Sequence, residues 1–199
     1  YEWNDEICSE SILPNPATLY GQCKNKLRLD AEAFAEASSL SLAWARLFFM
    51  YGPHEDSRRL VPSAILSLLK NRSAKFTSGE QLRDFIFVED AARAIVATLL
   101  SNFEGTLNVC SGKPMAIKEI VSLIADKLGV QDLVKFGALP TRPGDPSILV
   151  GDAGILSKDI GFTQHTSMNE AMERTICWWA EREGLLLPAD FGSECHGLK

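Results

Sequence analysis

Hydrophobic positions change between helical and extended spacing along this chain, which predicts alternating helices and strands. Residues 17–38 read as a helix, because apolar side chains recur there at intervals of three and four. The stripe comprises Leu27, Ala31, Phe34 and Ala35. Residues 40–50 are instead apolar almost without a break and end at Tyr-Gly-Pro, which is typical of a buried strand.

Further segments of both kinds follow. Helices are expected over 61–69, 89–101, 117–128 and 153–160, and a last helix carries Met168, Ala171, Met172, Thr175, Ile176 and Trp179 on one face. Strands are expected over 83–88, 107–109 and 133–136. Alternation of strands with helices predicts an α/β fold with parallel strand pairing.

Composition narrows the class of protein. The chain has 199 residues, 46% of them hydrophobic, which is enough for one substantial core. No apolar run approaches the roughly 20 residues of a membrane helix, and the first residues do not resemble a signal peptide, so we expect a cytoplasmic protein without a membrane partner. A net charge of −6 argues against a nucleic-acid partner. Five scattered cysteines lack metal-ligand spacing, so we expect reduced thiols and no metal.

Tyr20 and Lys24 stand four residues apart at the start of the first expected helix. This spacing places a phenol and an ammonium on one helix face, where the cation favours the phenolate. Such a pair suits proton transfer near neutral pH. With three tyrosines in the chain, the spacing also arises readily by chance, so the pair needs support from other residues.

Several further motifs supply that support. They are Pro-Ala-Thr-Leu-Tyr-Gly-Gln-Cys-Lys (16–24), Arg-Leu-Phe-Phe-Met-Tyr-Gly-Pro (46–53), Leu-Val-Pro (60–62), Ser-Gly-Glu-Gln-Leu-Arg-Asp-Phe-Ile-Phe-Val-Glu-Asp (78–90), Asn-Val-Cys-Ser-Gly (108–112) and Arg-Pro-Gly-Asp-Pro (142–146). In this order, the chain resembles the C-terminal part of an extended short-chain dehydrogenase/reductase, of the NAD(P)-dependent nucleotide-sugar epimerase/dehydratase type. The resemblance covers residues 16 to 180.

The resemblance implies roles for particular residues. Tyr20 would be the catalytic acid/base, and Lys24 would lower its pKa and hold the nicotinamide ribose of NAD or NADP. Arg83 and Arg142 would grip the diphosphate of a nucleotide-diphosphate sugar, for which forked guanidinium donors are well suited. The alternative for Arg83 is a structural salt bridge with Asp84, Glu89 or Asp90.

Other positions of the same motifs are expected to support the site. Tyr51 stands beside the cofactor in the family, and Val61 lines the nucleotide site; for both we favour scaffolding over direct contact. Phe49 replaces an asparagine that relatives often carry, so the sugar or its pose must differ. Asp90 is expected to cap a helix rather than to act in catalysis.

The family's glycine-rich cofactor loop and its catalytic Ser/Thr precede Tyr-x-x-x-Lys, and this chain contains no Gly-x-Gly-x-x-Gly. We therefore expect an incomplete chain that does not bind NAD(P) by itself. Residues 1–60 would end a Rossmann-type doubly wound domain. Residues 61–183 would form mostly the small α/β substrate-binding domain, with a Rossmann-associated strand and helix near 83–110, and 184–199 a tail.

For the whole protein, the resemblance implies an NAD(P)-dependent epimerase or 4-ketoreductase that works as a homodimer. A 4,6-dehydratase of the same family remains an alternative function, because the extra acid/base pair that such an enzyme needs would lie upstream of Tyr1 and outside this sequence. A non-catalytic binding protein that retains the fold is a further alternative. A reductase for steroids or flavonoids is disfavoured, because an apolar substrate has no use for two phosphate-binding arginines.

Overall fold

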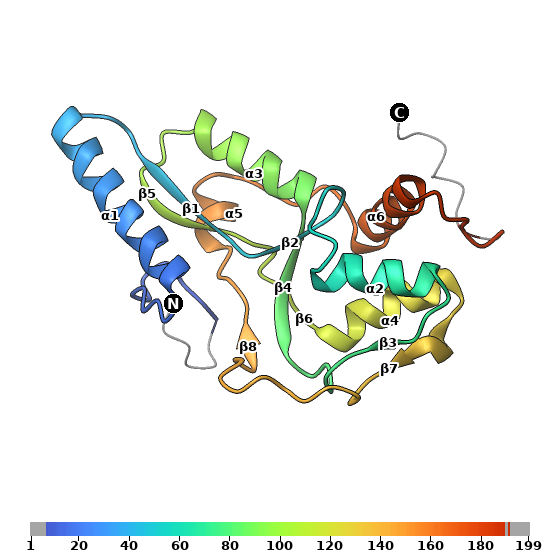
Figure 1. Ribbon diagram of the computed structural model, residues 1–199. Helices are drawn as coiled ribbons and strands as arrows, with labels where there is room; N and C mark the ends of the chain where they lie inside the picture. The colour runs from blue at the N-terminus through green and yellow to red at the C-terminus, as the bar shows by residue number, and fades with distance from the viewer. Residues whose placement is uncertain (1–6, 190, 192–199) are drawn as a thin grey trace.

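The structure is a computed structural model that describes residues 7–189 and 191 of the chain. Helices and strands alternate as expected (Figure 1). The helices are α1 (Leu19–Ser38), α2 (Leu60–Leu69), α3 (Val88–Leu100), α4 (Ile117–Leu128), the 3₁₀ helix η1 (Gln131–Leu133), α5 (Gly154–Lys158) and α6 (Met168–Glu183). The strands are β1 (Ala43–Leu47), β2 (Phe49–Tyr51), β3 (Ala74–Lys75), β4 (Leu82–Phe87), β5 (Gly105–Val109), β6 (Pro114–Ala116), β7 (Val134–Lys135) and β8 (Ile148–Leu149).

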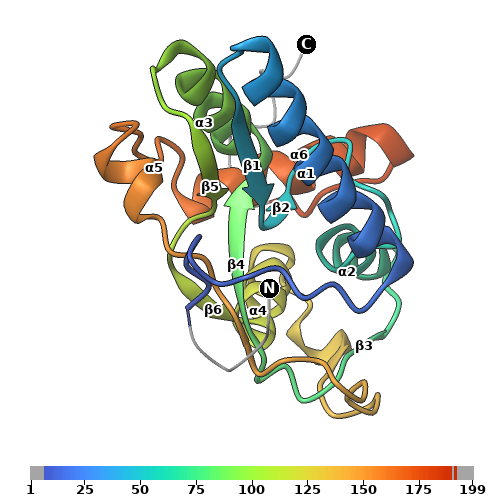
Figure 2. The same cartoon turned by 90° about the vertical axis from the view of Figure 1, so that its left-hand side faces the viewer.

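Strand pairing is mostly parallel, which confirms the α/β prediction. β1 pairs with β5, β2 with β4 and β3 with β7, all in parallel. β4 also pairs with β8 in parallel and with β6 in antiparallel orientation. In Figure 2, β4 runs through the middle of the molecule, with β5 and β1 above it. β4 thus connects the part built on β1 and β5 to the part built on α2 and α4.

The single strand expected over 40–50 is in fact two strands. The pairing partner changes at Phe48, because β1 pairs with β5 whereas β2 pairs with β4. The Phe48 amide donates to the Val109 carbonyl at 3.1 Å, and the Phe48 carbonyl accepts from the Met50 amide at 3.0 Å. An unbroken apolar run does not reveal where a strand exchanges one partner for another.

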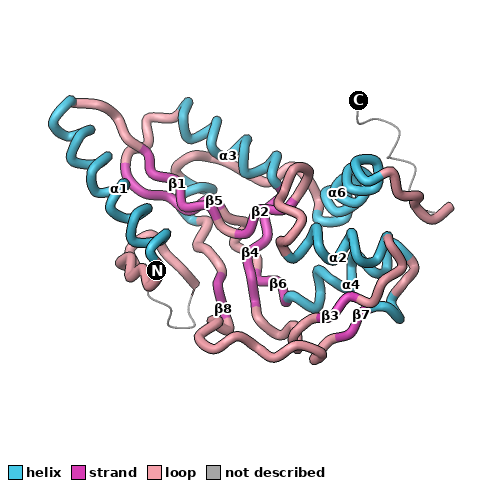
Figure 3. Tube along the Cα trace, viewed as in Figure 1, coloured by secondary structure: helices cyan, strands magenta, loops and turns pink. Residues whose placement is uncertain are grey.

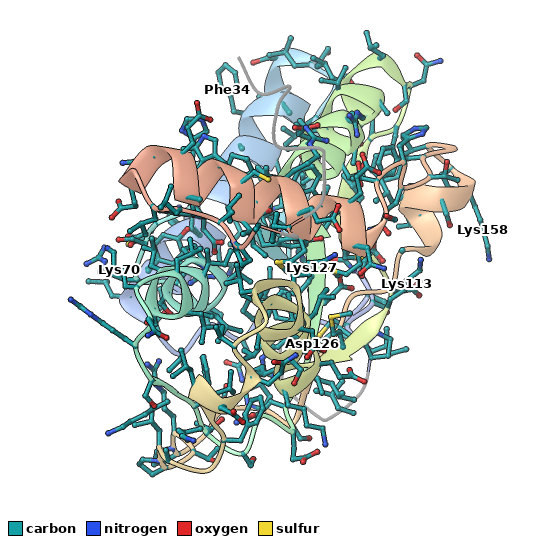
Figure 4. All side chains as sticks on the ribbon, turned by 90° about the vertical axis from the view of Figure 1, so that its right-hand side faces the viewer. Phe34, Lys70, Lys113, Asp126, Lys127 and Lys158 are labelled. Atoms are coloured by element: carbon teal, nitrogen blue, oxygen red, sulfur yellow. The ribbon has the colours of Figure 1, made fainter. Side chains whose placement is uncertain are left out.

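Side chains alternate along β4 and enter two different cores. Phe85 and Phe87 pack with α2, α4 and α6, whereas Ile86 packs with residues of α3, β5 and α5. Figure 3 shows α2, α4 and α6 together on one side of the strands, and α3 on another. Lys127 of α4 points toward α6 in Figure 4 and forms an ion pair of 2.6 Å with Glu173. Arg83 lies on the Phe85 face of β4, so it belongs to the side covered by these three helices.

Helix α1 lies away from α2, α4 and α6, and among its described residues only Ala35 is buried (Figure 1). Leu27 and Phe34 of the expected apolar stripe are 52% and 64% exposed. Figure 4 shows the Phe34 ring projecting away from the body of the molecule. Large apolar side chains are exposed on β1 and α3 as well, namely Leu47, Ile95, Val96, Leu99 and Leu100. We call these exposed residues of α1, β1 and α3 the apolar face.

The cysteines agree only in part with the expectation of reduced thiols. Cys8, Cys23 and Cys110 are free. Cys177 on α6 is disulfide-bonded, so the expectation is wrong for that residue. Cys195 lies outside the described residues, as do residues 1–6 and most of the expected tail.

Within the described part of the chain, no helix combines the length and apolar character needed to cross a membrane.

Candidate functional site

The start of α1 presents Tyr20 and Lys24. The Thr18 side chain accepts a hydrogen bond of 3.1 Å from the Gly21 amide, which caps the helix and fixes its first turn. Tyr20 follows in that turn and is 74% exposed, and Lys24 is exposed one turn later. Among residues 7–189 and 191, neither side chain has a hydrogen-bond or ion-pair partner. Both polar groups are therefore available to a ligand.

Tyr51 and Val61 are core residues. Tyr51 is buried, and its hydroxyl donates to the Met168 sulfur at 3.1 Å. Burial raises the pKa of Tyr51 well above its usual range, and the Asp90 charge adds to this effect. Val61 is buried in α2. Packing is the role that this geometry favours for both residues.

Arg83 is a buried cation on β4, only 4% exposed. Its Nη2 donates to Asp145 Oδ1 at 2.7 Å, and its Nη1 donates to the Leu82 carbonyl at 2.8 Å. The guanidinium carbon lies 5.9 Å from the centre of the half-buried Phe49 ring. The salt bridge is thus made with Asp145, a residue that the sequence analysis did not single out.

The three acids considered as alternative partners of Arg83 interact with other groups. The Asp84 carboxylate accepts from the amides of Ser111 (2.6 Å), Gly112 (2.9 Å) and Gly151 (3.2 Å). Glu89 forms ion pairs with Arg93 and Arg174.

Asp90 does not cap its own helix, contrary to expectation. α3 has no side-chain cap. The Asp90 carboxylate instead accepts from Arg93 Nη1 (2.9 Å) and from the amides of His165 (3.3 Å) and Thr166 (3.2 Å). It therefore ties α3 to the loop that precedes α6.

Arg142 is exposed on the loop between β7 and β8. The Asp145 amide donates to the Arg142 carbonyl at 3.2 Å, and Gly144 between them has a φ of +74°. Proline followed by a left-handed glycine is the pattern of a type II turn, in which Arg142 is the first residue and Asp145 the fourth. Two contacts therefore connect Arg83 to the backbone of Arg142 through Asp145.

Glu55 is a partly buried acid that the sequence analysis did not single out. It lies just after Tyr-Gly-Pro, with Oε1 at 3.6 Å from Arg59 Nε. Its Oε2 is buried and has no hydrogen-bond partner in the described chain. Burial raises the pKa of Glu55 to about 7, although Arg59 acts in the opposite direction.

A cavity of about 380 Å³ opens between β4, β6 and the loop before α6. Its lining includes Phe85, Phe87, Met115, His165 and Met168. Of the predicted site residues only Tyr51 lines it. Among residues 7–189 and 191, no hydrogen bond or ion pair joins Tyr20 or Lys24 to Arg83 or Arg142.

The fold and these residues define a class of protein, the Rossmann-type α/β proteins with a small second α/β part. Residues 1–110 match the model of the family described as "Epimerase: NAD dependent epimerase/dehydratase family". This match covers more than half of the chain, and the chain belongs to that family.

Relatives with known names agree with this assignment. The dTDP-glucose 4,6-dehydratase of Escherichia coli is 26% identical over 207 residues, which cover 88% of this chain and 54% of that protein. The UDP-N-acetylglucosamine 4-epimerase of Methanobrevibacter ruminantium M1, solved with UDP-N-acetylmuramic acid, is 30% identical with a TM-score of 0.81, covering 87% of this chain and 57% of that one.

The UDP-glucuronic acid 4-epimerase of Bacillus cereus, solved with UDP-glucuronic acid and NAD, shares the fold with a TM-score of 0.82 at 23% identity. That comparison covers 92% of this chain and 59% of the other. The chain spans about half the length of the curated relatives it matches.

Proposed function

We propose that the whole protein is an NAD(P)-dependent epimerase or 4-ketoreductase acting on a nucleotide-diphosphate sugar. The observation that carries this proposal is the pair Tyr20 and Lys24, exposed at the start of α1 and without a hydrogen-bond or ion-pair partner among the described residues, in a chain of the epimerase/dehydratase family. A family member that served only as a scaffold would have no need of two unpaired polar groups at these positions.

Tyr20 would exchange a proton with a sugar hydroxyl, and Lys24 would hold the nicotinamide ribose and favour the phenolate. NAD or NADP, when bound, supplies the hydride acceptor and donor. The exposed pair fits the nicotinamide end of this cofactor. The chain offers no glycine-rich loop for the pyrophosphate, so other residues must hold that end. Tyr51, named with the cofactor in the family, would act here by packing, because its hydroxyl is engaged by Met168.

The sugar nucleotide would meet the other half of the site. Arg142 would contact the diphosphate, and the buried Arg83, paired with Asp145, would hold the loop that carries Arg142, with Phe49 and Val61 shaping the wall beside it. The support for this assignment is the ion pair and turn that join the two arginines through Asp145. The lining role of Phe49 rests on its place beside the Arg83 guanidinium.

We further propose that an additional cofactor-binding part covers the apolar face in the whole protein. Matches to just over half of each relative support this, as do the exposed side chains of α1, β1 and α3. Residues 1–60 would then belong with that part. Residues 61–183 would be mostly the substrate-binding domain, apart from β4, α3 and β5 near 83–110. We expect the whole protein to be a cytoplasmic homodimer.

A 4,6-dehydratase is the second candidate. It is favoured by relatives of that name, such as the Escherichia coli protein, which match most of this chain. Both candidates use the same tyrosine, so the product distinguishes them.

The test incubates the whole protein with NAD or NADP and a panel of UDP- and dTDP-hexoses, and identifies products by NMR. A C4 epimer or a reduced sugar supports the main proposal. A 4-keto-6-deoxy sugar selects the dehydratase instead. Turnover of none of the panel, by folded protein that also fails to bind UDP and dTDP, rejects both.

A further inference from the structure

The structure assigns Asp145 a positioning role: its ion pair with the buried Arg83 sets where the exposed Arg142 stands. This inference rests on the proposed function, because Arg142 is taken to meet the diphosphate of the ligand. Through this ion pair, the loop between β7 and β8 can present the Arg142 cation in a defined place.

Arg83 needs an anionic partner because it is almost completely enclosed. A buried charge without a partner is strongly unfavourable, whereas a hydrogen-bonded ion pair offsets much of that cost. The side chain of Arg83 is 5% exposed and that of Asp145 is 32% exposed, with 2.7 Å between Nη2 and Oδ1. The Leu82 carbonyl and the Phe49 ring hold the guanidinium on its other sides. Arg83 is therefore a fixed anchor, and Asp145 is the residue drawn to it.

The turn from Arg142 to Asp145 links the position of Arg142 to that of Asp145. In a type II turn the first and fourth residues lie close together, and proline restricts the backbone between them. The Asp145 amide and the Arg142 carbonyl close the turn at 3.2 Å. Once Asp145 is held by Arg83, the Cα of Arg142 has little freedom to move.

The remainder of the loop has few other constraints. After the turn, the Leu82 amide donates to the Ser147 carbonyl at 2.8 Å, and β8 pairs with β4 beside Arg83. Among residues 140–146, Asp145 alone makes a hydrogen bond or ion pair with a residue outside that segment of the described chain. Loss of the Asp145 charge would thus free the turn from Arg83, while the pairing of β8 with β4 would remain.

Charge defines what the loop can bind. Asp145 neutralises Arg83, so Arg142 carries the unbalanced positive charge of this cluster. A guanidinium offers parallel donors that match the oxygens of a diphosphate. Asp145 acts through Arg142, and a carboxylate that instead contacted the ligand directly would behave differently on mutation.

The experiment measures binding of UDP and of dTDP to the whole protein by calorimetry, with KM and kcat for any sugar nucleotide that turns over. Asp145→Asn is expected to raise Kd about tenfold, with KM following and kcat nearly unchanged. Arg142→Ala should weaken binding at least as much. In the Arg142→Ala background, Asp145→Asn should add less than about a twofold effect, because the positioned group is already gone.

Two further variants separate positioning from damage to the fold. Asp145→Glu keeps the charge and should recover most of the affinity, whereas Asp159→Asn, an exposed acid at the end of α5, should bind like the wild type. Additive losses in the double variant, or an unchanged Kd in Asp145→Asn, would overturn the inference. Absence of UDP and dTDP binding in the wild type would instead reject the proposed function on which it rests.

Discussion

At the scale of single residues, Glu55 is a carboxyl group whose ionisation opposes folding. Its pKa rises from 4.5 to about 7, chiefly because the group is buried. The nearby Arg59 lowers the pKa, but by less than burial raises it. The folded state therefore holds a proton that the unfolded chain has already lost between pH 4.5 and 7. Stability contributed by this group is lost as the pH rises through that interval.

We predict that Glu55→Gln removes this pH dependence. As the pH rises from 5 to 8, the free energy of unfolding of the variant should increase relative to that of the wild type by about 2 kcal/mol. One pKa unit corresponds to about 1.4 kcal/mol, and partial exposure of Glu55 reduces the total. Urea unfolding at both pH values measures the gain. The matched variant Glu104→Gln, at an exposed position, should show no such change. Identical pH dependence in wild type and Glu55→Gln would contradict the prediction.

At the scale of elements, Asp90 shows how one buried carboxylate fixes the packing of two helices. It is 1% exposed and accepts hydrogen bonds from the loop before α6. We predict that Asp90→Ala destabilises the protein by about 3 kcal/mol, because two loop amides lose their acceptor and Arg93 loses a partner. Thermal and urea unfolding measure the loss.

The control for Asp90 is Asp132→Ala on η1, where the acid is exposed and a change within about 0.5 kcal/mol is expected. Equal stability losses in the two variants would show that Asp90 has no special part in holding α6.

The elements also show what a sequence can predict. α1 and α4 follow from their periodic apolar positions, and Gly129 ends α4 in the left-handed conformation expected of a C-cap. Strands β3, β6 and β8 have two or three residues, which is too short for a side-chain alternation to show. Tyr20 and Arg83 are found through motifs. The Arg83 partner, Asp145, is 62 residues away in the chain, and no local pattern indicates such a contact.

At the scale of the whole molecule, the apolar face has the composition of a surface that another part covers. Large apolar side chains that are exposed to water commonly mark a surface that another part of a protein covers. The proposed cofactor-binding part would bury Phe34 of α1, which is 64% exposed here.

Phe34→Ser distinguishes a covered from an open face in the whole protein. We predict a loss of about 3 kcal/mol in stability, as for a buried aromatic side chain. Leu186→Ser, at a position 92% exposed, should change stability by less than about 0.5 kcal/mol. A loss for Phe34→Ser no greater than that of Leu186→Ser would mean that the face stays open.

The central claim is that Tyr20 moves a proton for a nicotinamide-dependent reaction on a sugar nucleotide. Its most direct test compares Tyr20→Phe with Cys23→Ser, a change at an exposed thiol on the same helix, in the whole protein. We measure turnover with the sugar nucleotide that the wild type uses and the Kd of NAD. Tyr20→Phe should lower kcat about 1,000-fold and leave the Kd within about twofold, and Cys23→Ser should resemble the wild type. Full turnover by Tyr20→Phe would contradict the account.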